Sequence, residues 1–513
     1  EGFALVDSNT IVFGANLQTG DSVFIIQIGS AVTIPTPGDG TVAAAKIASG
    51  AVETAKIADD AVTAAKIGSL TGNINFADNA KAALGAGDDL QLFHDGTYSR
   101  INSENHGLII RTDVFHINNG ANNESLFRAT TNNAIELYYD NVKRLETTST
   151  GATVTGSVVA DNTPGRNLVI NGAMQVAQRG TSSTSTGYQT VDRFELIASG
   201  TDETPTQAQV DVASGTTPYT LGFRKALKLT NGNQTSVGAT DTIKTQYKFE
   251  AQDLAKSGWN YTSTSSDITL SFWIKSSVAQ SFKFSFITWD GSAKMYPMDT
   301  GSLSADTWTK ITKTIPGASG LSIDNDNAAG AQINFFQYLG TDYTNNSVTE
   351  NAWTSYGNPQ TKVQTTTWYT TNDATLEITG VQLEVGSVAT NFEHRSYTQE
   401  LALCQRYCEV LLEGEGDGAY MVNSVGYYTN QLYAIARFAV EKRASPTLVQ
   451  TTGTNYYINY RDNTGINFDS FNGLSWPNKR ATGLYATSTV TSGHAGLLGS
   501  SNSGAKVYVT AEI

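Results

Sequence analysis

A ten-residue repeat near the N-terminus constrains this chain more than any other feature. Between Val42 and Leu70 the sequence reads VAAAKIASGA, VETAKIADDA and VTAAKIGSL, with a Lys column followed by an Ile column. The apolar side chains recur every five residues, and this period matches neither an α-helix, nor a coiled coil, nor a flat strand. We expect a chain that repeats one turn and stacks one apolar side chain per step. These side chains recur every five positions, at Val42, Ile47, Val52, Ile57, Val62 and Ile67.

The repeat needs partners, because so short a unit cannot bury its apolar side chain alone. The segment is also too short for a long single-chain solenoid. We therefore predict that other copies of the chain cover it, most simply three around one axis, which makes the protein a homotrimer. The alternative interpretation is a flexible linker, since Ala, Gly, Ser and Thr dominate the segment.

The composition favours a β-rich protein and excludes several classes of partner. Hydrophobic residues make up 39% of the 513 residues and charged residues 16%, both below usual values, with Thr, Ser, Asn and Gly in their place. The net charge of −14 argues against nucleic acid, which needs a basic patch. The sequence has no apolar run of 18 residues, so we expect no membrane insertion.

Short alternating segments predict strands along most of the chain. Between residues 88 and 160 they include SRINSENHGLIIRT, VFHINNG and AIELYYDN, divided by Asn, Gly or Asp. So many strands in so few residues leave little room for a single-chain core, whereas interleaving three chains in a β-prism also removes exposed strand edges. Phe24–Ile26 is a further strand candidate. In the middle of the chain, Phe282, Phe284 and Phe286 share one strand face, and Phe272 and Ile274 share another.

One segment, TQELALCQRYCEVLL, predicts a helix that begins at residue 398, with Thr398 as its N-cap. Leu401, Cys404, Cys408 and Leu411 form its apolar stripe. A disulfide between positions four apart on a helix has poor geometry, and no second Cys or His pair completes a metal site. We therefore expect both cysteines to be reduced and buried.

Several of these segments resemble tail fibre proteins of bacteriophages, notably of marine and cyanobacterial phages. The resemblance rests on DLQLFHDGTYSRI, GLIIRT and LYYDNVKRLETTSTGATVTG, and on the Lys-rich repeat before them. Segments 166–196 and 376–401 resemble the two ends of a fibre β-sandwich, a fold similar to carbohydrate-binding modules. CQRYCE resembles a fibre linker helix, and FAVEKRASPTLV resembles a fibre-tip turn.

The resemblance implies a mainly β, elongated homotrimeric fibre in the virion tail. With the strand pattern it predicts six parts: a small β collar (1–38), the repeat shaft and linker (39–87), an interleaved β-prism shaft (88–162), a jelly-roll-like β-sandwich (163–397), a linker helix (398–413) and a C-terminal receptor-binding β-knob (414–513). The sequence begins with Glu1, so we also expect a preceding part that contacts other tail proteins.

The implied function is adsorption to a host-cell receptor, a protein or a surface glycan such as lipopolysaccharide. We expect no catalytic residues, metal or cofactor: the five histidines are scattered, and no nucleophile or phosphate-loop motif is present. The run SIDNDN lacks the distal Glu of a calcium loop. Two alternatives stay open, a depolymerase with a carboxylate pair and a purely structural fibre.

Aromatic clusters are the binding candidates, because sugars stack on aromatic faces and bond to nearby polar groups. In NYYINYRDN we expect Tyr457 and Asn459 on one strand face, and Tyr456 and Tyr460 on the other. The alternative is that these rings are core or trimer interface. The first candidate group is Tyr427, Tyr428, Tyr456, Tyr457, Tyr460, Arg461, Asp462 and Trp476, and the second is Trp353, Tyr356, Trp368 and Tyr369.

Overall fold

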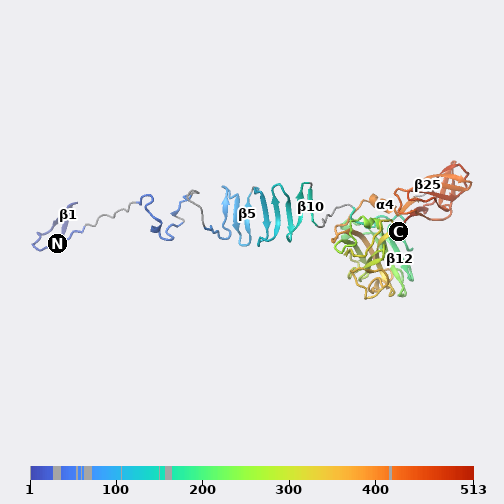
Figure 1. Ribbon diagram of the computed structural model, residues 1–513, viewed down its shortest axis with the longest axis horizontal. Coiled ribbons are helices and arrows are strands. Elements are labelled where there is room, and N and C mark those ends of the chain that lie inside the picture. Colours follow the sequence, from blue (N-terminus) through green and yellow to red (C-terminus); the bar gives the residue numbers. More distant parts are fainter. Residues whose placement is uncertain are drawn as a thin grey trace. The chain divides into compact units, whose positions relative to one another are not determined.

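A computed structural model describes residues 2–26, 36–53, 56–58, 61–62, 72–104, 107–149, 151–155, 165–414 and 419–513 (Figure 1). Strands hold 41% of the residues and helices 5%, so the predicted mainly β class is confirmed. The contacts divide the chain into two compact units, Glu1–Asp113 and Val114–Ile513. The pairings between named strands in the described residues are antiparallel, and each lies within one of the two units.

The N-terminal unit begins with a hairpin of β1 (Phe3–Asp7) and β2 (Thr10–Phe13). The strand predicted at Phe24–Ile26 is wrong: this run is irregular and its side chains are 68–89% exposed. Apolar side chains alone do not form a strand where no partner strand satisfies the backbone. A sheet of β3 (Ala82–Leu84), β4 (Leu90–His94) and β5 (Ser99–Ser103) ends the unit.

The described part of the repeat turns once every five residues. Backbone N–H groups donate to carbonyls three residues earlier at Ala43/Lys46, Ala48/Ala51, Glu53/Lys56 and Ala58/Ala61, and the first turn is the 3₁₀ helix η1 (Ala44–Lys46). The prediction of one repeated turn is therefore confirmed over these residues. Residues 63–71, which complete the repeat, lie outside the described ranges. The apolar column from Val42 to Val62 is 43–54% exposed.

The second unit opens with a five-stranded antiparallel meander. Paired residues share a face, and the rows Ile117–Phe127–Leu137–Leu145–Val154 and Phe115–Ala129–Ile135 place apolar side chains on one face. The other face carries His116, Arg128, Glu136 and Glu146. The strand predicted over SRINSENHGLIIRT is confirmed in its first part, Ser99–Ser103, and wrong in its last part, since residues 107–112 are irregular. The strands are β6 (Val114–Asn118), β7 (Ser125–Thr130), β8 (Ile135–Tyr139), β9 (Val142–Thr148) and β10 (Gly151–Val154).

A β-sandwich of two six-stranded sheets follows (Figure 1, green to orange). Phe272 of one sheet contacts Phe284 and Phe335 of the other, with ring centroids 5.2 and 5.0 Å apart, so the two inner faces share one core. As predicted, Phe272, Ile274, Phe282, Phe284 and Phe286 are buried.

The first sheet has the order β11 (Ser182–Ser183), β13 (Thr206–Asp211), β14 (Lys225–Thr230), β22 (Thr375–Val385), β16 (Asp267–Ser276) and β19 (Thr309–Pro316). The second has the order β12 (Phe194–Ser199), β15 (Thr242–Glu250), β20 (Ala329–Leu339), β17 (Lys283–Thr288), β18 (Lys294–Asp299) and β21 (Thr354–Ser355). Three short helices lie in the connections: α1 (Thr217–Thr220), α2 (Ala251–Ala255) and α3 (Thr367–Thr370).

The helix predicted at 398–413 is half the expected length. The helix α4 spans Tyr397–Gln405, and its N-cap is Ser396 in a capping box with Gln399, not Thr398. Residues Cys408–Glu413 form strand β23, which pairs with β32 (Lys506–Thr510). The prediction failed because the apolar pattern of CEVLL fits both a helix and a strand. Pairing with β32, about a hundred residues further along the chain, makes it a strand. Cys404 and Cys408 are free and buried, as expected.

The C-terminal residues form a seven-stranded antiparallel sheet and a three-stranded one around a shared core that contains Tyr457, Phe468, Phe471 and Leu498. The three-stranded sheet has the order β23-β32-β26 (Thr447–Gln450). The larger sheet has the order β28 (Thr464–Phe468), β27 (Tyr457–Arg461), β31 (Ala495–Ser500), β24 (Tyr420–Tyr428), β25 (Gln431–Arg437), β30 (Ala481–Thr487) and β29 (Gly473–Ser475).

Candidate functional site

A groove of about 960 Å³ lies on the outer face of the seven-stranded sheet. Its floor follows from strand register, because Val425 pairs with Tyr433 and Asn423 pairs with Leu497. Gly483 on β30 pairs with Ile435 on β25 and with Ser475 on β29. A side chain at this position would place its Cβ 3.0 Å from the main-chain oxygen of Ser475. We call this site the aromatic groove; its principal lining residues are Tyr420, Asn423, Val425, Tyr427, Tyr433, Ile435, Ser475, Trp476, Asn478, Gly483 and Leu497.

Aromatic rings dominate the exposed lining of the groove. Tyr433 stacks on Tyr485 with centroids 5.7 Å apart, and Tyr427 contacts Tyr433 at 5.1 Å. Trp476 is 78% exposed and has a φ of 48°, a conformation that bulky residues rarely adopt. Strain of this kind concentrates at functional sites. The groove therefore offers exposed ring faces that the C-terminal core does not use.

The groove is mostly apolar and carries no charge in its described lining. Asn423, Ser475, Asn478 and Thr482 supply amide and hydroxyl groups along its length, and no Asp, Glu, Lys, Arg or His stands among the described residues that line it. Such a surface can stack on apolar ring faces and exchange hydrogen bonds with hydroxyls. It supplies neither an ionised partner for a charged ligand nor a proton donor and acceptor pair for catalysis.

The structure divides the first candidate group. Tyr427 and Trp476 line the aromatic groove, and Tyr428, 58% exposed, contacts Tyr427 with centroids 4.6 Å apart. Sequence reasoning missed Tyr420, Tyr433 and Ile435, which the same strands carry. The signal was present in the alternation of QLYAIAR, which follows the turn at Asn430.

The candidates on and beside β27 are separate from the groove lining. Tyr457 was a wrong choice, because it is fully buried and donates to the Thr451 carbonyl at 2.7 Å. Asn459 is buried on the same face, so the predicted alternation is confirmed. Tyr456 contacts the core, and Tyr460 donates to Asn463 at 2.8 Å. Arg461 pairs with Asp462 at 3.1 Å and contacts His494.

The second candidate group does not form one site. Trp368 and Tyr369 are 0% and 1% exposed, so they belong to the sandwich core rather than to a binding surface. Burial and the nearby Asp241 raise the pKa of the Tyr369 hydroxyl, which donates to that carboxylate at 2.8 Å. Trp353 is partly buried and donates to the Pro316 carbonyl at 2.7 Å. Tyr356 alone of the four is 36% exposed, beside Trp289.

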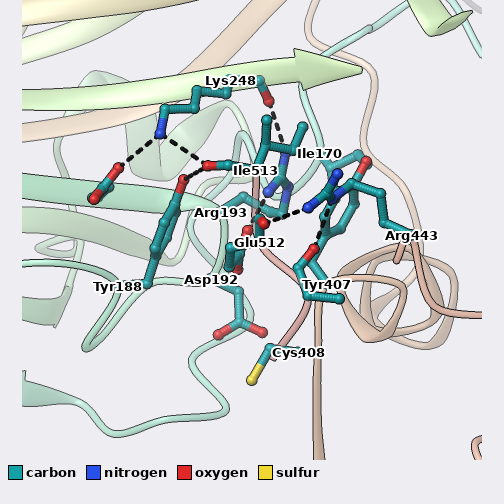
Figure 2. Close-up of polar contacts among 12 residues, drawn as sticks. Ile170, Tyr188, Asp192, Arg193, Lys248, Tyr407, Cys408, Arg443, Glu512 and Ile513 are labelled. Atoms are coloured by element: carbon teal, nitrogen blue, oxygen red, sulfur yellow. Dashed lines mark hydrogen bonds and ion pairs between the residues drawn. The ribbon is translucent and has the colours of Figure 1, made fainter. Parts of the chain in front are cut away.

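A buried charge cluster joins the sandwich to the C-terminal domain (Figure 2). Glu512 accepts hydrogen bonds from Arg179 at 2.9 Å and from Arg193, while Asp192 lies 3.5 Å from Arg179. Burial raises the pKa of Asp192 to about 6, although Arg179 opposes the shift. Burial likewise raises the pKa of the Cys408 thiol. Two cations thus face two carboxylates, an arrangement suited to holding the two domains together rather than to chemistry.

Within the described ranges no group of three His, Cys, Asp or Glu side chains is placed to hold a metal ion. No helix in the same ranges has the length and apolar character to cross a bilayer. The aromatic groove is therefore the best-formed candidate site.

No protein-family model matches the chain, and no curated protein matches it. Similar solved structures include the enzymatically active domain of tailspike protein 4 from bacteriophage CBA120. That match has 12% identity and a TM-score of 0.24, and covers 44% of this chain and 22% of that one. This chain thus spans about a fifth of the tailspike structure.

Two further similar structures are carbohydrate-binding modules. The family 11 module of Clostridium thermocellum, in complex with a β-1,3-1,4-mixed-linked tetrasaccharide, has 12% identity and a TM-score of 0.19, and the match covers 42% of this chain and 98% of the module. The tandem CBM22 modules of Paenibacillus barcinonensis Xyn10C have 9% identity and a TM-score of 0.21, over 70% and 100%. Because these values are low, the function proposed below rests on the residues of this chain.

Proposed function

We propose that this chain is the distal, receptor-binding part of a bacteriophage tail fibre of the marine or cyanobacterial type, and that the aromatic groove binds a host surface glycan such as lipopolysaccharide. The fibre-like segments described above supply the class of protein. The observation that carries the binding site is the set of exposed rings beside an uncharged, mostly apolar floor in which Asn423 and Asn478 supply polar groups.

The chemistry of the groove fits a neutral sugar better than other ligands. Tyr427, Tyr433 and Trp476 offer ring faces to the C–H faces of sugars, while Asn423 and Asn478 offer both donors and acceptors to hydroxyl groups. The volume lies at the upper end of the range for small-molecule sites, which suits a short oligosaccharide. Phosphate, nucleic acid and acidic peptides lack a countercharge here.

The proposed partners in the assembly are two further copies of the chain. The apolar face of the β6–β10 sheet has no cover in the described residues: Ile117, Ile135 and Leu137 are 44–46% exposed. On the opposite face, Glu136 is less exposed than these apolar side chains. A contiguous exposed apolar face of this kind marks an interaction surface, and three copies around an axis would bury all three apolar faces together.

We infer recognition rather than cleavage at the groove. Glycoside hydrolysis requires two carboxyl groups about 5–10 Å apart that flank the scissile bond. The described lining of the aromatic groove has no carboxyl group at all. A sugar held there meets stacking and hydrogen-bonding groups but no general acid or nucleophile.

The proposal is tested by titrating the protein against polysaccharides from candidate host cells. We expect binding that Trp476→Ala weakens at least tenfold and that Tyr98→Ala, a matched loss of an exposed ring outside the groove, leaves unchanged. Equal binding by both variants would remove the groove from the proposal. New reducing ends after incubation would indicate a depolymerase, and intact oligomers that bind no host cell would indicate a structural fibre.

A further inference from the structure

A second hollow, of about 390 Å³, lies on the outer face of the sandwich sheet that contains β15 and β20. Lys244, Gln246 and Lys248 alternate along β15 and therefore share this face. Gln332 enters from β20, and Trp289 and Tyr356 form one wall with ring centroids 4.8 Å apart at 68°. We call it the lysine hollow.

The amide groups of the lysine hollow are held in fixed directions. Trp289 Nε1 donates to Gln332 Oε1 at 3.3 Å, Gln332 Nε2 donates to Gln246 Oε1 at 2.8 Å, and Gln246 Nε2 donates to Glu195. Each donor in the chain fixes the next amide, so the polar groups are pre-oriented rather than free to rotate. Pre-orientation lowers the entropy cost of binding.

Lys244 differs from its neighbour in having no partner. Lys248 donates to the main-chain oxygen of Ile513 at 2.8 Å and lies 3.4 Å from Glu195. Among the described residues Lys244 Nζ forms no hydrogen bond or ion pair, and Glu195 acts on it only through space. Burial lowers the pKa of Lys244, with Glu195 opposing and Lys248 adding to the shift. A half-buried ammonium with three unused donors favours an anion.

We propose that the lysine hollow binds one acidic sugar unit, with its carboxylate on Lys244 and its ring beside Trp289 and Tyr356. The anion supplies the countercharge that Lys244 lacks. Gln332 Nε2 donates to Gln246 and to Asn334, so the groups left for sugar hydroxyls are the second N–H of Gln246 Nε2 and the remaining lone pairs of the two amide oxygens. The cavity is at the lower end of the size range for small-molecule sites, so a single sugar unit fits. This inference goes beyond the proposed function, because it adds a charge-selective site in the sandwich that does not depend on the aromatic groove.

The test compares methyl glucuronide with methyl glucoside, which differ at C6 by a carboxylate against a hydroxymethyl group. In saturation-transfer NMR titrations of the whole chain, we expect the glucuronide to bind at least tenfold more tightly, as a charge-assisted hydrogen bond predicts. Lys244→Gln should remove that preference. Lys310→Gln, the same charge change on β19 of the other sheet, should keep it.

Three results would overturn the proposal: equal binding of the two glycosides, an unchanged preference in Lys244→Gln, or no glucuronide binding at tens of millimolar. Acetate serves as a further probe, and acetate binding as tight as that of the glucuronide would show a carboxylate site without sugar recognition, which also overturns it. Trp476→Ala should leave glucuronide binding unchanged, so failure of the aromatic groove and failure of the lysine hollow give different results.

Discussion

Removal of the Glu512 charge should weaken the junction between the sandwich and the C-terminal domain. In the wild-type protein, Arg179 and Arg193 are balanced by Asp192 and Glu512. Figure 2 shows the Arg193–Glu512 pair with Asp192 nearby. The side chains of both arginines are at most 3% exposed and that of Glu512 is 8% exposed. In Glu512→Gln, the amide cannot neutralise either guanidinium, and its NH₂ group competes as a donor for the same space.

The expected loss of stability in Glu512→Gln follows from the partners that each arginine retains. Arg179 retains Asp192. Arg193 retains the Lys248 carbonyl at 2.7 Å and the rings of Tyr407 and Tyr247, whose centroids lie 3.5 and 5.2 Å from its guanidinium carbon, and none of these carries a charge. One buried cation is therefore left without a countercharge. Breaking a buried pair in this way costs about 3–5 kcal/mol, which corresponds to more than about a hundredfold in the opening equilibrium.

Two measurements check the expectation. Urea unfolding followed by tryptophan fluorescence reports the sandwich, which holds six of the seven tryptophans. The labelling rate of the buried Cys408 thiol reports local opening of the junction, because Cys408 lies beside the cluster. We expect Glu512→Gln to lower the urea midpoint and to accelerate labelling.

The matched control is Glu413→Gln, which removes a carboxylate that is 59% exposed and paired with Lys506 at 2.7 Å. A pair this exposed is screened by solvent and contributes less than about 1 kcal/mol. If Glu512→Gln changes stability and labelling no more than Glu413→Gln does, the reasoning is refuted. Adding Arg193→Met to Glu512→Gln should recover part of the loss, because it removes the unpaired cation.

Three further predictions follow from other parts of the structure. Leu137→Asp, on the apolar face of the β6–β10 sheet, should reduce the native mass from three times the 54.8 kDa chain mass towards one chain, whereas His116→Asp on the opposite face should not; an unchanged mass in Leu137→Asp would contradict this face as the interface, and a wild-type mass of one chain would contradict the trimer. Because burial raises the pKa of Asp192 to about 6, the folded state holds a proton between about pH 4 and 6 that the unfolded state has released, so this group's contribution to stability falls as pH rises. Asp192→Asn should therefore gain stability relative to wild type between pH 4 and 7 in urea titrations, and a constant difference would refute the shift. Ser396→Ala should lower stability by about 1 kcal/mol through loss of the α4 N-cap, measured by urea unfolding against Ser387→Ala.

The strand content was predictable because its signals are local. In IELYY and VKRLETT the alternation of side chains specifies both the strand and its faces, and Asp140 and Asn141, with φ of 51° and 57°, form the turn between them. The five-residue period similarly predicted the repeated turns after Val42, because Val, Lys and Ile recur at the same positions of each ten-residue word. In both cases the information lies within a few residues.

The errors in the sequence-based predictions arose where segments far away in the sequence determine the local structure or the burial of a side chain. CEVLL becomes a strand because Lys506–Thr510 pairs with it, and no pattern near Cys408 reveals that partner. Tyr457, Trp368 and Tyr369 resemble exposed rings in sequence, but strands from other parts of the chain bury them. The lysine hollow was invisible for the same reason: Lys244, Trp289 and Gln332 meet only through the pairing of β15, β20 and β17.

The two proposed sites differ in a way that bears on avidity. The aromatic groove lacks charge, whereas the lysine hollow holds an unpaired cation, so the two select different sugar units of one polysaccharide. Linked weak sites bind through effective concentration, provided that the ligand can span them, and three copies of the chain would multiply the effect. The affinity for intact polysaccharide should then exceed the affinity for its monosaccharides by more than either site alone explains. Loss of either site should reduce that excess, yet leave the sugar preference of the other unchanged.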